Sequence, residues 1–320
     1  MAGTAAESMR VDKFLTDFAV SFKAALPEYV ADVVAPRVTV KQRSGKYRVW
    51  QKSEDYRIDS DAAPRRPGTE SSRIDVEMTE ADYSTAFYAR HVLVPKDDET
   101  ELDGEVELEL ESTERLVDQM LALREKRVAG VLTDPAKITQ NLDCSLNAGA
   151  NQFSTAGSNP FTIIQAGIAA VYAASGVKPN QLVLPWDVAI ALRNNAKYIE
   201  RYQNFKDTVQ DLELAPKIMG LTPVIAGSQF NSAKRDTAKT LTLQTIWGKN
   251  AIICYTPNPD VRRIGRGTLC TMKSFWLPDQ SHVIKWFENK LNSTYVEQQE
   301  CISEHLVAAQ TAYLLRNVIA

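Results

Sequence analysis

The sequence predicts an α+β protein with more than one domain, and three patterns along its 320 residues support that class. Four short runs between residues 38 and 94 alternate between apolar and polar side chains, as half-buried strands do. Residues 105–132 carry apolar side chains at helical spacing within a charged segment. Residues 160–255 mix apolar strand-like runs with helical runs, which indicates a compact α/β unit.

The N-terminal segment is predicted to contain one amphipathic helix. Residues 11–25 place Phe14, Phe18 and Phe22 at helical spacing, and Pro27 stops the pattern. Two interpretations stay open: the apolar face packs on the helix's own domain, or it docks on a neighbouring molecule.

A long β-hairpin is predicted next. Residues 38–42 and 47–50 alternate, residues 74–78 and 86–94 alternate again, and a tip rich in Pro, Gly and charge lies between them at 59–68. A hairpin of this length is marginally stable by itself. We therefore expect it to lie on another surface, supplied by a partner.

The strongest charge run covers residues 97–114, which contain ten acidic side chains and no Lys or Arg. It leads into a helix predicted over 105–132 and ended by Asp134-Pro135. Alternation over 105–111 also fits a strand, but Glu is a poor strand former. The acidic side chains form a solvated helix face, a Ca²⁺ or Mg²⁺ site, or a surface that receives basic residues of another subunit.

The second half of the chain predicts a loop over 141–159 and then a compact α/β unit. The expected elements are helix 160–175, strand 181–184, helix 186–203, strand 221–226, strand 240–246, strand 251–255, a further strand at 295–304, and an apolar segment over 306–319 that closes a sheet.

Several classes of function are not expected. The net charge of −3 provides no basic field for nucleic acid. No apolar run is long enough to span a membrane, and the N-terminus is not a signal peptide, so we expect the chain to stay in the cytosol where it is made. The four cysteines match no zinc or redox spacing and are expected to be buried free thiols.

Catalytic motifs are not found in the sequence. Three histidines are present, at 91, 282 and 305, without a nucleophile elbow, a Walker loop or a dinucleotide fingerprint. We therefore expect no catalytic residue, no cofactor and no metal site.

Six short segments in the second half of the chain resemble those of a known protein family. They are Asn159-Pro160-Phe161, residues 179–184, residues 191–195, residues 198–202, residues 219–227 and residues 246–253. Their order and spacing resemble the major capsid proteins of tailed double-stranded DNA phages, the family with the Johnson fold. The resemblance covers nearly the whole chain.

The resemblance implies a phage major capsid protein fold of five parts. Residues 1–38 resemble an N-terminal arm, and 39–96 an extended β-hairpin loop. Residues 97–156 resemble the peripheral domain, with its long spine helix and antiparallel strands. Residues 157–291 resemble the α/β axial domain, and 292–320 the C-terminal strands that close the peripheral and axial domains.

The resemblance also implies a function. The chain is expected to self-assemble as pentamers and hexamers into an icosahedral shell in the host cytoplasm, to form the virion capsid, and to enclose double-stranded DNA without sequence-specific binding. Because only residues 1–36 precede the hairpin, we expect either a separate scaffolding protein or a chain supplied already processed, besides a portal. No lysine lies between Lys52 and Lys96, so covalent crosslinking at the hairpin tip is not expected.

Contacts between subunits are expected to join a basic hairpin tip to an acidic spine, where complementary charge sets register more than affinity. The predicted contact residues are Arg65, Arg66, Glu105, Glu107, Phe14 and Phe18.

Two alternatives remain. An encapsulin, a shell that houses a cargo enzyme, shares the fold and would use an N-terminal helix with Phe14, Phe18 and Phe22 as its cargo dock. An α/β hydrolase-like enzyme would need a histidine within hydrogen-bond reach of a Ser or Cys in a closed pocket near helix 186–203.

Overall fold

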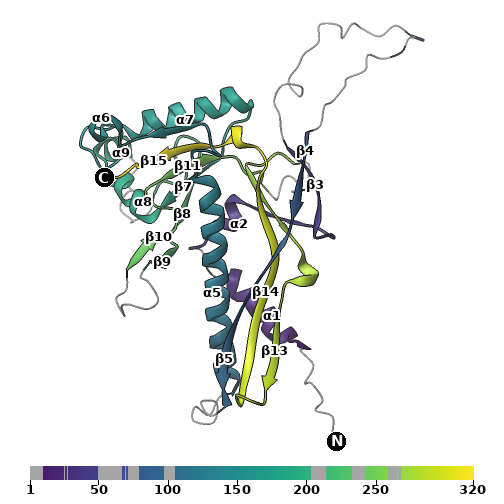
Figure 1. Ribbon diagram of the computed structural model, residues 1–320. Coiled ribbons are helices and arrows are strands. Elements are labelled where there is room, and N and C mark those ends of the chain that lie inside the picture. The colour runs from purple at the N-terminus through teal and green to yellow at the C-terminus, as the bar shows by residue number, and fades with distance from the viewer. Residues whose placement is uncertain are drawn as a thin grey trace, which may run out of the picture.

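One long helix organises the molecule. The computed structural model describes residues 10–24, 26, 28–49, 67–68, 70, 79–96, 105–202, 214–232, 242–258, 265 and 268–320. Helix α5 (Glu105–Leu132) has 28 residues and is about 42 Å long at 1.5 Å per residue. Figure 1 shows it running alongside the long strands of one sheet, with a second sheet and helix α7 at its far end. The predicted helix over 105–132 is confirmed.

The apolar positions of α5 explain why a helix forms where the acidic end alternates like a strand. Leu116, Val117, Met120, Leu121 and Val128 are all buried, and spacings of three, four and seven residues place them on one face of the helix. This stripe covers one face of the neighbouring sheet, so tertiary packing stabilises the helix along its length.

The first sheet, which we call the peripheral sheet, has six strands, and three of them pair with one long central strand. Its central strand pairs with one strand along one edge, and with two others in succession along the opposite edge. The strands are β14 (Ser293–Leu306) in the centre, β5 (Ala86–Pro95) on one edge, β13 (His282–Glu288) and β12 (Met272–Trp276) on the other, then β1 (Arg10–Val11) and β2 (Arg37–Thr39) outside them.

The strands of the hairpin pair differently from what the sequence pattern predicts. Its described base pairs β3 (Ser44–Val49) with β4 (Thr79–Ser84). The alternating run at 86–94 belongs to β5, which pairs with β14 over its whole length. Alternation reports that one face is buried, and it does not report which strand lies alongside. Of the predicted tip at 59–68, residues 59–66, which include Arg65 and Arg66, lie outside the described residues.

The second sheet, which we call the axial sheet, has five strands and is covered by helices. In spatial order the strands are β6 (Asn141–Asp143), β15 (Tyr313–Arg316), β11 (Ala251–Cys254), β7 (Gln181–Pro185) and β8 (Thr222–Ala226). Helix α7 (Pro160–Ser175) begins with proline, which suits a first helical position, and ends at Gly176 with φ 71°, a left-handed cap. The predicted helix 160–175 is confirmed.

Short elements complete the described chain. They are α1 (Lys13–Ala24), α2 (Ala31–Val34), α6 (Leu146–Gly149), the ribbon of β9 (Gln229–Asn231) with β10 (Leu243–Thr245), and two 3₁₀ turns, η1 (Pro278–Gln280) and η2 (Ala309–Thr311).

The end of α5 joins the two sheets. Val128, Ala129 and Leu132 are buried in one apolar cluster with Ile252 and Leu314 of the axial sheet. A second cluster fills the space between the axial sheet and helices α7, α8 (Trp186–Arg193) and α9 (Ala196–Tyr202). The axial sheet is therefore buried on both faces, which fits the continuous apolar sequence of its central strands.

The helix predicted over 186–203 is two helices, α8 (Trp186–Arg193) and α9 (Ala196–Tyr202). Asn195 separates them, and its Oδ1 accepts a 2.9 Å hydrogen bond from the Lys197 amide as a cap. Its Nδ2 donates to the Phe153 carbonyl and to Ser158 Oγ, both at 3.0 Å. The helical periodicity on both sides conceals this break, because a single polar residue scarcely disturbs it.

We expect Asn195→Ala to lower the free energy of unfolding by about 1–3 kcal/mol, because the change leaves buried hydrogen-bonding groups without a partner. Urea denaturation followed by circular dichroism measures this loss. The neighbouring Asn194 is exposed, so Asn194→Ala serves as the control. Equal losses in the two variants would contradict the role given to Asn195.

All four cysteines are buried free thiols, as expected from their spacing. In the described part of the chain, no helix is long and apolar enough to cross a membrane.

Candidate assembly surfaces

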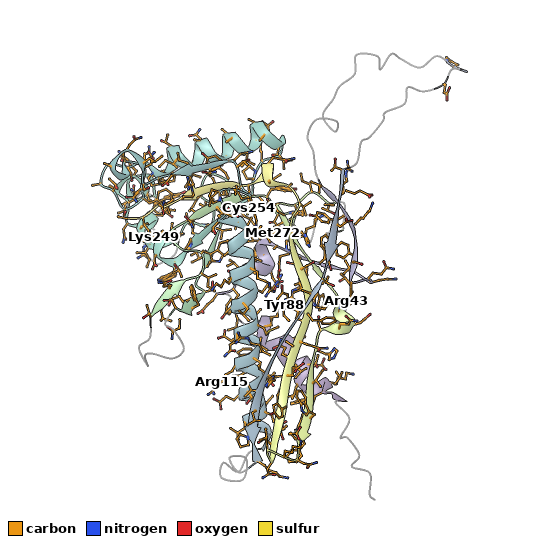
Figure 2. The ribbon with its side chains drawn as sticks, viewed as in Figure 1. Arg43, Tyr88, Arg115, Lys249, Cys254 and Met272 are labelled. Atoms are coloured by element: carbon orange, nitrogen blue, oxygen red, sulfur yellow. The ribbon has the colours of Figure 1, made fainter. Side chains whose placement is uncertain are left out.

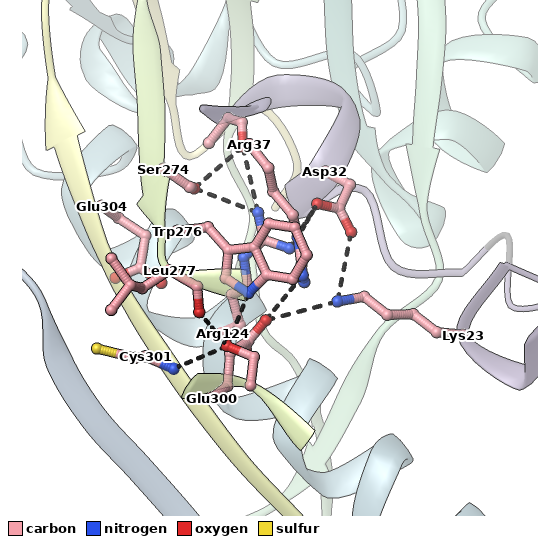
Figure 3. Close-up of polar contacts among 12 residues, drawn as sticks. Lys23, Asp32, Arg37, Arg124, Ser274, Trp276, Leu277, Glu300, Cys301 and Glu304 are labelled. Atoms are coloured by element: carbon pink, nitrogen blue, oxygen red, sulfur yellow. Dashed lines mark hydrogen bonds and ion pairs between the residues drawn. The ribbon is translucent and has the colours of Figure 1, made fainter. Parts of the chain in front are cut away.

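The N-terminal segment is fastened to α5 by a network of charged side chains (Figure 3). Arg124, only 1% exposed at its side chain, pairs with Asp32 at 2.6 Å. Arg37 Nε lies 2.8 Å from the same carboxylate, and Arg37 Nη1 lies 2.8 Å from Glu300 of β14. Burial, with repulsion from Arg124, lowers the pKa of Arg37 to about 10. We call Asp32, Arg37, Arg124 and Glu300 the arm clamp.

A second buried connection lies one residue further along α5. Glu125 is fully buried, and its carboxylate accepts hydrogen bonds from Trp247 Nε1 at 2.5 Å, from the Ala31 amide at 2.7 Å and from the Val30 amide at 3.3 Å. Burial raises the pKa of Glu125, against the opposite effect of these three donors. The carboxylate joins the N-terminal segment, α5 and the turn before β11.

The peripheral sheet is attached to α5 by Arg127. Its guanidinium forms a bidentate pair with Glu304 of β14, with Nη2 at 2.8 Å and Nε at 3.1 Å. It also lies 3.8 Å from the ring centre of Tyr88 on β5, in cation–π geometry. Tyr88 is labelled in Figure 2. A planar guanidinium suits both contacts, whereas lysine would keep only the charge.

The base of the hairpin is anchored on this same body. Phe275, fully buried on β12, stacks on Tyr83 of β4 at 4.5 Å and lies 5.2 Å from the Tyr47 ring of β3. A Cβ at Gly45 would approach Tyr83 Oη to 2.9 Å, so glycine leaves room for that ring. The hairpin therefore begins from a fixed root within its own subunit.

Helix α1 packs on its own chain. Leu15 and Ala19 are buried against Leu116 of α5 and Val296 of β14. Of the two interpretations of this helix, packing on its own domain is confirmed. The side chain of Phe14 remains 62% exposed.

The opposite side of α1 still offers surface to another molecule. Phe18 is half-buried and stacks on Phe22, with 6.2 Å between ring centres. A cavity of about 630 Å³ lies beside the helix, lined in part by Val20, Lys23 and Trp276. Contacts of Phe14 and Phe18 with a second subunit remain a prediction.

The acidic run is less uniform than a solvated face. Glu109 is buried and pairs with Lys285 of β13, whereas Glu111 is exposed and pairs with Arg115 one turn along. Glu105 and Glu107 lie in the first turns of α5, but their side chains are outside the described set. Among described residues, no group of three or more His, Cys, Asp or Glu is arranged to hold a metal ion.

One histidine lies within hydrogen-bond reach of a hydroxyl. His305 Nε2 is 3.2 Å from Ser303 Oγ, two residues away on β14. Burial lowers the pKa of His305, which packs on the rings of Tyr47 and Phe275. The pair belongs to the peripheral sheet and not to the neighbourhood of α8 and α9, where the enzyme alternative requires it. Its packing is that of a core histidine.

The whole fold matches known structures. A phage-related protein from Bordetella bronchiseptica RB50 superposes with a TM-score of 0.74 at 18% identity, covering 98% of each chain. The capsid of cyanophage P-SCSP1u matches with a TM-score of 0.57 at 12% identity, covering 99% of this chain and 91% of the other. The encapsulin of Synechococcus elongatus PCC 7942 matches with a TM-score of 0.53 at 10% identity, covering 99% and 94%. The chain thus has the fold of the phage capsid proteins, as predicted.

A sequence relative agrees with this class. The chain is 21% identical over 324 aligned positions to the major capsid protein of Burkholderia phage BcepMu, and the alignment covers 96% of each sequence. No protein-family model matches the chain.

The sequence pattern does not predict these buried charged contacts. Arg124, Glu125 and Arg127 belong to a run of four charged residues, 124–127, inside the predicted helix. The signal that could have marked them is position: they continue the apolar stripe between Leu121 and Val128.

Proposed function

We propose that this chain is a major capsid protein that assembles with copies of itself into a closed shell. The observation that carries the proposal is the end-to-end likeness to a phage major capsid protein, which leaves no large part of either chain unmatched. The role is structural and not enzymatic. It needs no cofactor, and the geometry of the clamps serves rigidity and not chemistry.

The mechanism follows from a rigid body and an anchored hairpin. An icosahedral shell repeats heterologous contacts around five-fold and six-fold axes, so each subunit must present the same body at slightly different angles. The arm clamp and Glu125 hold α5, the N-terminal segment and both sheets as one unit. The hairpin leaves this unit from a fixed root, and we propose that it extends over a neighbouring copy.

The division of the chain follows from the same proposal. Residues 1–38 form the arm, 39–96 the extended loop, 97–156 the peripheral domain with its spine, 157–291 the axial domain, and 292–320 the closing strands. Two described features support the last part: β14 is the central strand of the peripheral sheet, and β15 lies inside the axial sheet.

The partners belong to the proposal as well. Copies of the chain form pentamers and hexamers in the host cytoplasm and become the virion capsid, which encloses double-stranded DNA without reading its sequence. A separate scaffolding protein and a portal take part in assembly. The net charge of −3 fits a container that does not grip its nucleic acid along an extended basic surface.

Electron microscopy of the expressed protein tests the proposal. Closed icosahedral particles are the expected result. A protein that is monomeric when purified from cells that also make the other capsid components would contradict the proposal. The contents separate the capsid from the encapsulin alternative, since the fold is common to both. Double-stranded DNA and a portal vertex support a capsid, whereas an enclosed enzyme supports an encapsulin.

The proposed tip-to-spine contact makes a separate prediction. Arg65→Glu with Arg66→Glu is expected to leave the monomer folded and to reduce assembled particles, because two attractive pairs with Glu105 and Glu107 of a neighbour become repulsive. Size-exclusion chromatography measures the assembled fraction, and circular dichroism checks folding.

A variant that restores the complementary charge gives the more specific test. Adding Glu105→Arg and Glu107→Arg to the reversed tip is expected to recover particles. The control reverses two exposed lysines elsewhere, Lys178→Glu with Lys217→Glu, for the same change of net charge. Normal shells from the Arg65/Arg66 variant refute the contact.

A further inference from the structure

A groove with an acidic rim lies where the arm, the spine helix and the axial part meet. Its volume is about 690 Å³. Its lining residues come from all three parts: Glu28 and Tyr29 of the arm, Asp118 of α5, and Trp186, Ile225 and residues 227–229 of the axial part.

The charges of this groove are unbalanced. Within the described residues, neither Glu28 nor Asp118 pairs with a lysine or arginine. Asp118 accepts a 2.5 Å hydrogen bond from Tyr29 Oη, which orients the carboxylate without neutralising it. Burial and this carboxylate raise the pKa of Tyr29, so the phenol stays a neutral donor. The groove therefore presents negative charge with a fixed geometry.

A second feature points to a ligand independently of the charge. Ser228 lines the groove with only 2% of its surface exposed, and its Oγ has no hydrogen-bond partner. A buried hydroxyl without a partner costs free energy that an incoming donor would recover. Trp186 also lines the groove, and its large indole is 48% exposed and available to an amphipathic side chain.

We propose that this groove receives an arginine side chain from a neighbouring copy of the chain. The apolar stem of arginine packs along Trp186 and Ile225, and its forked guanidinium donates to the carboxylates of Asp118 and Glu28 and to Ser228 Oγ. Five N–H donors on one planar group match three separate acceptors, which a single ammonium satisfies less well. The like charge of phosphates excludes DNA as the occupant.

This inference rests on the proposed function, since a neighbouring copy is present only in an assembly. A second copy is the occupant that fits best for two reasons. The groove joins the three parts of the subunit that the shell must hold at fixed angles, and an inserted cation would add to that hold. The chain itself supplies many cations, with 37 lysines and arginines in total.

A density map of assembled wild-type particles at side-chain resolution is the first test. We expect a guanidinium of an adjacent copy over Trp186 and within hydrogen-bond distance of Asp118 and Ser228. An empty groove, or one filled by a different protein such as a scaffolding protein, overturns the inference and leaves the shell function intact. If no particles form at all, the proposed function fails, and this inference fails with it.

Variants supply the second test. Glu28→Gln with Asp118→Asn keeps the shape of the groove and an acceptor for Tyr29, and it removes both charges. We expect this pair to raise the subunit concentration needed for half-maximal assembly ~10-fold, as the loss of a close charge pair does. Asp82→Asn with Asp279→Asn removes two exposed charges elsewhere and is expected to change that concentration less than ~2-fold.

Each outcome of the variant experiment decides the point. A Glu28/Asp118 variant that assembles like the control pair, while its thermal unfolding is unchanged, overturns the inference. If that variant does not fold, Trp186→Ala replaces it, because an exposed indole contributes little to the isolated subunit. Loss of assembly with normal folding in Trp186→Ala supports the inference, and normal assembly overturns it.

Discussion

Glu125→Ala is expected to lower the free energy of unfolding of the isolated subunit by about 3–5 kcal/mol. The carboxylate is fully buried, and its removal leaves Trp247 Nε1 and the amides of Val30 and Ala31 without acceptors. The three donors come from the turn before β11 and from the N-terminal segment, so both lose this connection to α5. Urea denaturation monitored by tryptophan fluorescence measures the effect directly, since Trp247 is itself a reporter.

Two further variants show whether the arrangement of acceptors is the cause. Glu125→Gln keeps the volume, but its amide NH₂ must face a donor, so we expect an intermediate loss between wild type and alanine. Glu111→Ala lies on the same helix in an exposed pair with Arg115 and should cost less than about 1 kcal/mol. If Glu125→Ala lowers the free energy of unfolding no more than Glu111→Ala does, the Glu125 carboxylate does not join the three parts.

Phe275→Ala is expected to cost about 3–5 kcal/mol of stability and to reduce shell assembly more than that loss alone explains. The ring is fully buried and contacts Tyr83, Tyr47 and His305, which form the root of the hairpin. The cavity left behind frees the root to tilt, so the extended loop no longer leaves the body at one angle. Denaturation gives the stability, and sedimentation gives the assembled fraction at matched folded concentration.

The control for this variant is another phenylalanine in the peripheral sheet. Phe87 on β5 is 45% exposed and lies under Arg43, so Phe87→Ala is expected to cost about 1 kcal/mol or less. Phe275→Leu keeps most of the volume and should recover most of the stability. If Phe275→Ala assembles normally once enough folded protein is present, the root does not set the hairpin direction.

These expectations share one structural idea, namely that shell subunits place their strongest internal contacts where parts of the chain meet. The arm clamp, Glu125 and the hairpin root all join segments that lie 90 or more residues apart in sequence, such as Asp32 with Arg124. Exposed ion pairs such as Lys197 with Glu200 contribute little by comparison. A shell under load therefore depends on the junctions within each subunit as well as on the contacts between subunits.

The sequence by itself determined the elements that depend on local periodicity and local breakers. Helix α5 needs only its apolar stripe and the Asp134-Pro135 stop, and α7 needs only its N-terminal proline and Gly176. Both are found where the pattern places them, because helical hydrogen bonds and caps are formed between residues close in sequence. The capsid resemblance rests on six short segments of the second half together with the order of the predicted elements.

The tertiary structure alone decided which distant segments pair and which charges are buried. Alternation at 86–94 is the same whether that strand completes a hairpin or lies against β14, since a strand pattern records a buried face and not a neighbour. Arg124 and Glu125 look like solvated helix residues until the arm and Trp247 come to lie over them. Partners separated by a hundred residues leave no periodic trace, because their contact depends on the path of the chain between them.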